Sequence, residues 1–147
     1  MSRAALLDVN VLVALFDPDH IHHELAHDWF AGSRGDGWAT CPVTENGFLR
    51  VLANPGYRGV LTRPSELLAR LRRFCSSGHH AFWPDHVSLR DPEIFDPSFI
   101  AGPRQITDIY LLGLAKVKGG RLVTFDGGIP LRAVRGGDRH LLLVIAP

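Results

Sequence analysis

The sequence predicts an α/β fold in which a mostly parallel sheet lies between helices, and three observations support this prediction. Short apolar runs alternate along the chain with segments of helical periodicity, which is the order of elements in α/β proteins. The runs Leu122–Phe125 and Leu141–Ile145 are apolar at nearly every position, as strands buried on both faces are. A length of 147 residues, with 46% hydrophobic and 21% charged, suits a single domain spanning residues 1–147.

The first half of the chain reads as two strand and helix units. Ala4–Leu7 predicts a buried strand, and helical periodicity follows over Val11–Phe16 and Ile21–Ala31. A second short strand is expected over Trp38–Cys41. Because proline suits the first turn of a helix, the next helix is expected over about Pro42–Ala53.

The second half continues the alternation up to the two apolar runs near the end. Pro64 opens a helix whose leucines recur at helical spacing as far as Phe74. Ala81–Trp83 is expected as a strand. Gln105–Lys118 carries the strongest helical pattern, and the glycine pair that begins at Gly119 ends it.

Charge and cysteine content exclude several classes of protein. The formal net charge of +1 argues against a broad basic surface for nucleic acid. Cys41 and Cys75 are 34 positions apart without zinc-type spacing, so a reducing, cytoplasmic setting is expected. The apolar stretch Ala4–Phe16 contains Asp8 and Asn10 and is too short to cross a bilayer, so neither a signal peptide nor a membrane anchor is expected.

Acidic side chains occur in apolar surroundings where predicted strands end or helices begin. They are Asp8, Glu45, Asp108 and Asp126. One acid at such a junction often only caps the helix. The carboxyl ends of parallel strands meet at one edge of the sheet, where ligands bind. Two carboxylates roughly 4 Å apart repel by about 4 kcal/mol. Four of them therefore predict a hard divalent cation, Mg²⁺ or Mn²⁺, and a phosphodiester substrate.

The segments that carry these acids resemble the PIN-domain ribonucleases, and among them the VapC toxins of bacterial toxin–antitoxin pairs. The matching segments are Leu6–Leu15, Thr44-Glu45, Thr107–Ala115 and Leu122–Asp126. The resemblance implies a three-layer fold with a mostly parallel five-stranded sheet, and a Mg²⁺-dependent endoribonuclease. It also implies a structured RNA substrate such as tRNA or rRNA, inhibition of translation and growth, a homodimer, and a small antitoxin that blocks the site.

The same resemblance assigns roles to individual residues. Asp8 and Asp108 match the principal metal-binding acids, and Glu45 and Asp126 match the acids that complete the catalytic site directly or through water. Asn10 and Thr124 match polar residues that lie near the metal and its ligands. The histidine-rich run 20–27 is expected at the start of an outer helix, away from the acids.

Other classes of function remain open from the sequence. A phosphatase or receiver-like α/β domain also places an aspartate at a strand end, but Asn10 stands where a second acid would be needed. A PIN-fold module that binds without catalysis would not need all four acids. A PIN-domain nuclease that processes RNA without being a toxin is a further alternative, which the residues do not separate from a toxin.

Overall fold

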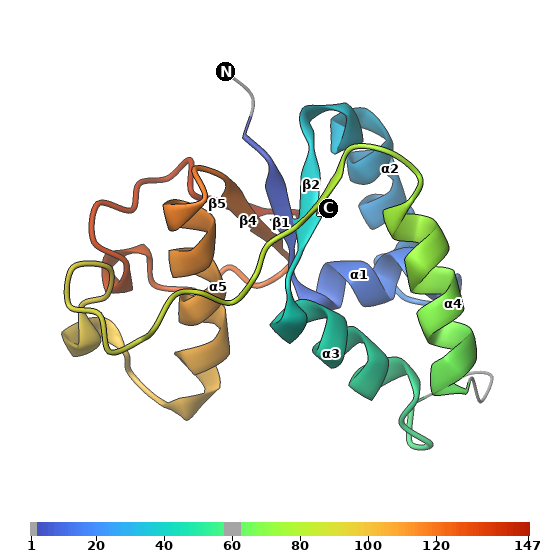
Figure 1. The fold of residues 1–147 in the computed structure, drawn as a ribbon, viewed down its shortest axis with the longest axis horizontal. Helices are drawn as coiled ribbons and strands as arrows, with labels where there is room; N and C mark the ends of the chain where they lie inside the picture. Colours follow the sequence, from blue (N-terminus) through green and yellow to red (C-terminus); the bar gives the residue numbers. More distant parts are fainter. Residues whose placement is uncertain (1–2, 58–62) are drawn as a thin grey trace.

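The computed structural model describes residues 3–57 and 63–147, and its strands form one sheet with helices on both faces (Figure 1). The sheet has five strands in the order β3-β2-β1-β4-β5. Their bounds are β1 (Ala5–Leu7), β2 (Trp38–Thr40), β3 (His80–Phe82), β4 (Arg121–Thr124) and β5 (Leu142–Val144). Every pairing between these strands is parallel. The predicted α/β class and parallel sheet are confirmed.

Helices cover the two faces of the sheet unequally (Figure 1). One face carries α1 (Val9–Phe16), α2 (His23–Ser33), α3 (Pro42–Leu52) and α4 (Pro64–Cys75), and the other carries α5 (Ile106–Val117). Short 3₁₀ turns occupy Arg34–Asp36, Pro97–Phe99, Pro103–Gln105 and Leu131–Ala133. These layers match the three-layer arrangement that the resemblance implied.

Alternation along the strands builds two separate cores. Leu7 and Trp38 point into the core under α1–α4, whereas their neighbours Leu6 and Ala39 point into the core under α5. This division follows from the period of two in a strand, which sends successive side chains to opposite faces. It also decides on which face a polar residue at the end of a strand emerges.

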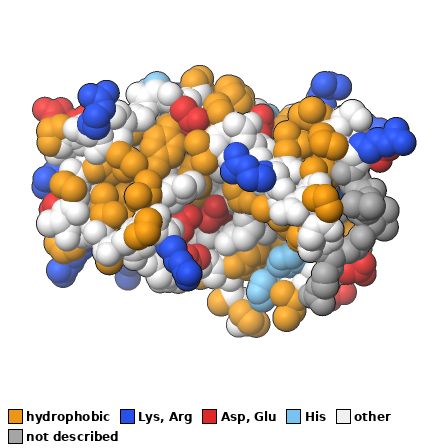
Figure 2. Space-filling view, turned by 90° about the horizontal axis from the view of Figure 1, so that it is seen from below, with side chains coloured by type: hydrophobic (Ala, Val, Ile, Leu, Met, Phe, Trp, Pro, Cys, Tyr) orange, Lys and Arg blue, Asp and Glu red, His pale blue; other side chains and the backbone are white. Residues whose placement is uncertain are grey.

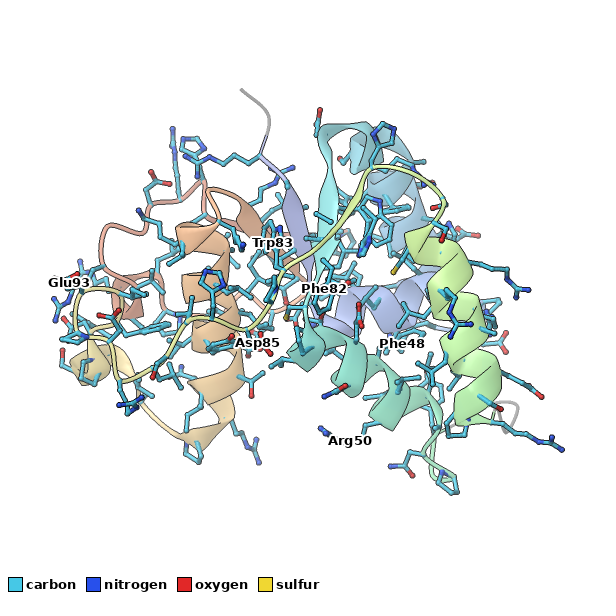
Figure 3. All side chains as sticks on the ribbon, viewed as in Figure 1. Phe48, Arg50, Phe82, Trp83, Asp85 and Glu93 are labelled. Atoms are coloured by element: carbon cyan, nitrogen blue, oxygen red, sulfur yellow. The ribbon has the colours of Figure 1, made fainter. Side chains whose placement is uncertain are left out.

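Large side chains fill the two cores (Figure 3). Phe48 of α3 is fully buried in the core under α1–α4, and Trp83, just after β3, packs in the core under α5. The chain after β3 crosses to the α5 side of the sheet (Figure 1), where Phe95 is fully buried. The Phe95 ring lies so close to Gly113 of α5 that a Cβ there would collide with it. The absence of a side chain at this glycine thus permits the close packing.

The element boundaries differ slightly from those predicted. Helix α1 begins at Val9, two residues earlier than expected, because Asp8 caps it and starts the first turn at once. The expected helix over Gln105–Lys118 begins with a 3₁₀ turn and continues as α5 from Ile106. The strands are shorter than their apolar runs, since hydrogen-bonded pairing ends before apolar burial does.

Within residues 3–57 and 63–147, no helix is both long enough and apolar enough to cross a membrane.

Candidate active site

Three of the four predicted acids line one pocket at the carboxyl ends of the strands. Asp8 follows β1, Asp126 follows β4, and Asp108 lies in the first turn of α5. They border a pocket of about 360 Å³, which we call the three-acid pocket. Figure 2 views this edge of the sheet and shows acidic side chains in a hollow at its middle, with histidines beside it.

Asp8 is the most enclosed acid of the pocket, with 6% of its surface exposed. Its Oδ1 accepts a hydrogen bond from the Val9 N–H at 2.8 Å, and its Oδ2 accepts one from the Thr124 hydroxyl at 2.7 Å. Burial raises the pKa of Asp8, the two hydrogen bonds oppose that rise, and the nearby Asp126 carboxylate adds to it. The side chain is therefore held in one orientation but destabilised as an anion.

The fully buried Thr124 hydroxyl connects three parts of the pocket. It donates to Asp8 and accepts from the Asn10 side-chain amide at 3.3 Å and from the Asp126 backbone N–H at 3.1 Å. The Asp126 Oδ1 in turn accepts from the Gly128 N–H at 2.8 Å. This network sets the relative positions of the Asp8 and Asp126 carboxylates.

Asp108 is held beside the two other acids of the pocket. Burial, followed by the negative charges of Asp8 and Asp126, raises its pKa from 3.8 to about 6. No basic side chain contributes to these shifts. Carboxylates that crowd together without a cationic partner are stabilised by a bound cation.

The donor atoms of the three-acid pocket fit a hard divalent ion. Carboxylate oxygens are the preferred ligands of Mg²⁺ and suit Mn²⁺ as well. The Asn10 Oδ1 is buried at the pocket and has no hydrogen-bond partner among the described residues. Since a buried acceptor without a donor is costly, this oxygen is a further group that a hydrated cation would satisfy.

Glu45, the fourth predicted acid, has different surroundings. It is not among the described residues that line the three-acid pocket. Its Oε2 accepts a hydrogen bond from the Thr40 hydroxyl at 2.6 Å, and that hydroxyl also contacts His80 Nε2 at 2.8 Å. Thr40 follows Ala39 and so emerges on the α1–α4 face of the sheet, opposite to the face of Thr124 and Asp8. The sequence could not reveal the Thr40 and His80 contacts, because they depend on the pairing of β2 with β3.

A cysteine and a histidine complete this second group of side chains. The ligand atoms of Glu45, Cys75 and His80 all lie within 4.8 Å of one another, and we call these residues the thiol cluster. Burial, followed by the Glu45 charge, raises the pKa of Cys75 to about 11. Burial lowers the pKa of His80, against the opposing effect of Glu45. The pattern in the sequence did not indicate this cluster, since Cys75 and His80 lack a zinc-type motif.

The histidine-rich run differs from its prediction at one end. His20 lines the three-acid pocket, and its ring stacks against Phe125 with centroids 6.4 Å apart. The prediction that the run lies away from the acids was therefore wrong for this residue. His23 and His27 instead contact backbone oxygens of α1, at 2.7 and 3.0 Å. The turn before α2 folds back over the strand ends, and local sequence patterns do not specify that path.

Comparison with known proteins agrees with this architecture. The PIN domain family model matches residues 5–135. Ribonuclease VapC44 of Mycobacterium tuberculosis is 43% identical over 141 residues, covering 96% of this chain and 99% of the relative. Ribonuclease VapC39 of the same organism is 43% identical over 132 residues, covering 90% and 95%. Ribonuclease VapC38 is 46% identical over 125 residues, covering 85% and 86%. The resemblance inferred from the sequence is confirmed: this chain belongs to the PIN-domain family, and within it to the VapC ribonuclease toxins.

Proposed function

We propose that this ribonuclease is a Mg²⁺-dependent endonuclease that cleaves a structured RNA, tRNA or rRNA, and thereby inhibits translation and growth. Mn²⁺ is the expected substitute for Mg²⁺. The observation that carries the proposal is the convergence of Asp8, Asp108 and Asp126 on one pocket, where the pKa of Asp108 rises to about 6. Crowded carboxylates without a basic partner are a site prepared for a cation.

The three acids would hold the metal. When bound, a divalent ion polarises an attacking water molecule and the scissile phosphate. Asp8 offers a carboxylate that the Val9 N–H and the Thr124 hydroxyl keep in place. One of the three acids would accept the proton of the attacking water.

The remaining predicted site residues have supporting roles in this proposal. Thr124 orients Asp8 and the backbone of Asp126, and Asn10 presents an unpaired oxygen to the pocket. Glu45 is proposed as the fourth catalytic acid because it matches the corresponding acid of the family. To act there, its carboxylate must leave the Thr40 hydroxyl and turn toward the pocket.

The shape of the site favours unpaired RNA. A negatively charged pocket of about 360 Å³ admits an exposed backbone more readily than a duplex. The net charge of +1 provides little general attraction to a polyanion, so binding depends on the metal and on local contacts. We therefore expect cuts at one or a few loop positions.

The biological setting follows from the family. We propose a cognate antitoxin of the VapB type, a homodimer, and action in the cytoplasm. The relatives are named ribonucleases, and membership in their family supports the RNA substrate. An RNA-processing nuclease without toxicity is the alternative, and the growth test described in the Discussion distinguishes the two.

Digestion of RNA by the purified full chain tests the proposal. Total RNA and plasmid DNA are incubated side by side with Mg²⁺, with Mn²⁺, and with EDTA, and the new RNA ends are mapped. The wild type is compared with Asp8→Asn, and with Asp28→Asn as a control, because Asp28 is an exposed acid on α2.

We expect metal-dependent cuts at few positions, loss of about 100-fold or more in rate for Asp8→Asn, and unchanged cleavage for Asp28→Asn. RNA binding without cleavage in both metals would instead identify a non-catalytic binding module. Rapid cutting of DNA, or ends scattered through helical RNA, would overturn the proposed substrate class.

A further inference from the structure

We propose that the edge of the sheet opposite the three-acid pocket binds phosphate groups of RNA. Basic side chains gather at this edge: Arg3 just before β1, Arg121 as the first residue of β4, Arg139 in the turn before β5, and Lys116 in the last turn of α5. We call these four residues the basic edge. The inference rests on the RNA substrate of the proposed function and adds a second contact with that RNA, away from the acids.

The basic edge lies where the parallel strands begin, whereas the three-acid pocket lies where they end. In Figure 1 it is the end of β1 that is nearest to the N-terminus. The strands contain three or four residues and rise about 3.3 Å per residue, so about 10–13 Å of sheet separates the two edges. A folded RNA that lies along the molecule can therefore contact both.

Two hollows form the surface of the basic edge. One has a volume of about 420 Å³ and is lined by Arg3 and Lys116. The other has a volume of about 470 Å³ and is lined by Arg3, Arg121 and Arg139. Because Arg3 borders both, the two hollows adjoin each other. Charges of one sign around a concave surface reinforce one another, so a phosphate that enters either hollow meets at least two basic side chains.

Acidic side chains do not neutralise the basic edge. Asp36 and Asp138 also line the hollows, but within residues 3–57 and 63–147 neither forms an ion pair with a basic side chain. The Asp138 Oδ1 instead accepts a hydrogen bond from the His140 backbone N–H at 2.8 Å. Four basic side chains against two acidic ones leave an excess of positive charge here, although the net charge of the whole chain is only +1.

Arg121 provides the most direct indication of an anion. Its Nε is buried and has no hydrogen-bond partner among the described residues, although the side chain lines the larger hollow. A buried donor without an acceptor is costly. The guanidinium is a planar group that binds phosphate through two parallel N–H bonds. A phosphate oxygen is therefore the kind of acceptor that this side chain lacks.

The distribution of charge explains how a negatively charged pocket can act on a polyanion. The three-acid pocket repels RNA until a metal ion is bound. The basic edge attracts RNA without a metal, and contacts with phosphates position a nucleic acid without reading its sequence. Phosphate is favoured over the carboxylates of an acidic peptide because the chain belongs to a family of ribonucleases.

Binding of RNA to the full chain in the absence of metal tests the inference. Fluorescence anisotropy of a labelled single-stranded RNA of about 12 nucleotides is measured in EDTA over a range of NaCl concentrations. The variants are Arg121→Gln and Arg139→Gln, and the control is Arg90→Gln, which removes an exposed arginine from the loop after β3. Circular dichroism checks the folding of each variant. Since Arg139 lies in an exposed turn, its variant tests the site even if Arg121→Gln does not fold. Inorganic phosphate and a poly-glutamate peptide are added as competitors.

We expect the wild type to bind the RNA in EDTA, with a slope of log K against log salt of about −2, as for about three neutralised phosphates. Arg121→Gln and Arg139→Gln should each weaken binding about 10-fold at low salt and reduce the steepness of the slope by about 0.7. Arg90→Gln should bind as the wild type does. Inorganic phosphate should displace the RNA only at much higher concentration, and poly-glutamate should not displace it.

Equal weakening by all three variants would indicate general attraction between charges and overturn the inference. The absence of RNA binding in EDTA would also overturn it. Displacement of the RNA by poly-glutamate at the same charge concentration would identify a site for acidic peptides, and displacement by equally dilute inorganic phosphate would identify a site for the free ion. Binding is measured without cleavage, so failure here leaves metal-dependent cleavage by the wild type intact and is distinct from failure of the nuclease function.

Discussion

Replacement of Asp108 by asparagine should stabilise the metal-free protein at neutral pH. The pKa of this carboxyl is raised from 3.8 to about 6, because it is half-buried beside two other acids. The Asp108 carboxyl therefore binds its proton more tightly in the folded protein than in the unfolded chain. The folded protein loses stability as the pH rises from 3.8 through about 6 and this proton is released. The neutral asparagine keeps the size of the side chain and removes this loss.

The magnitude follows from the shift. A rise of about two in the pKa of Asp108 corresponds to a loss of about 3 kcal/mol in the free energy of unfolding. Screening by solvent at this partly exposed residue reduces that loss to about 1–1.5 kcal/mol. With about 2–4 °C per kcal/mol, the melting temperature of Asp108→Asn should exceed that of the wild type by about 3–5 °C at pH 7.5. Because the loss accumulates between the two pKa values, the gain at pH 5 should be about half as large.

Thermal melting in EDTA at pH 5 and pH 7.5 measures the effect. The exposed acid variant Asp28→Asn serves as the control and should change the melting temperature little at either pH. Excess Mg²⁺ should stabilise the wild type more than Asp108→Asn, because the variant lacks one of the proposed ligands. Equal melting temperatures at pH 7.5, or a gain that does not depend on pH, would refute the reasoning.

Four further predictions concern the site, the packing and the organism. Thr124→Val removes the hydroxyl that orients Asp8 and should lower metal affinity by about 10–100-fold in calorimetry with Mn²⁺ while the circular dichroism spectrum stays unchanged. Gly113→Ala places a methyl group against the Phe95 ring and should cost about 1–3 kcal/mol in urea unfolding. Gly32→Ala meets no atom within 4 Å and should stabilise the chain by about 0.5–1 kcal/mol. Expression of the wild type without an antitoxin should arrest bacterial growth, whereas Asp8→Asn at the same protein level should not.

Each of these predictions has a contrary result. Unchanged metal affinity in Thr124→Val would mean that the hydroxyl does not position Asp8. Equal stability of Gly113→Ala and Gly32→Ala would show that the Phe95 ring can move away freely. Equal growth with wild type and Asp8→Asn would remove the toxin proposal and leave an RNA-processing nuclease.

The sequence by itself determined the class of fold and the approximate place of the acids. Apolar runs that alternate with helical segments can bury both faces only as a parallel sheet between helices, and such a sheet gathers its strand ends at one edge. Asp8, Asp108 and Asp126 stand at those ends or at a helix start, so their meeting in one pocket follows from topology. Element boundaries were predictable only to within a few residues, because capping and strand pairing decide where hydrogen bonding stops.

Only the tertiary structure decided which polar groups share a face of the sheet. Asp8 and Thr124 are 116 positions apart, and the parallel register of β1 with β4 places the hydroxyl 2.7 Å from the carboxylate. The pairing of β2 with β3 instead brings Thr40 beside His80, where its hydroxyl binds Glu45. A one-residue change in register would reverse these partners, since successive side chains point to opposite faces. Long-range strand pairing therefore decides which hydroxyl each of these acids meets.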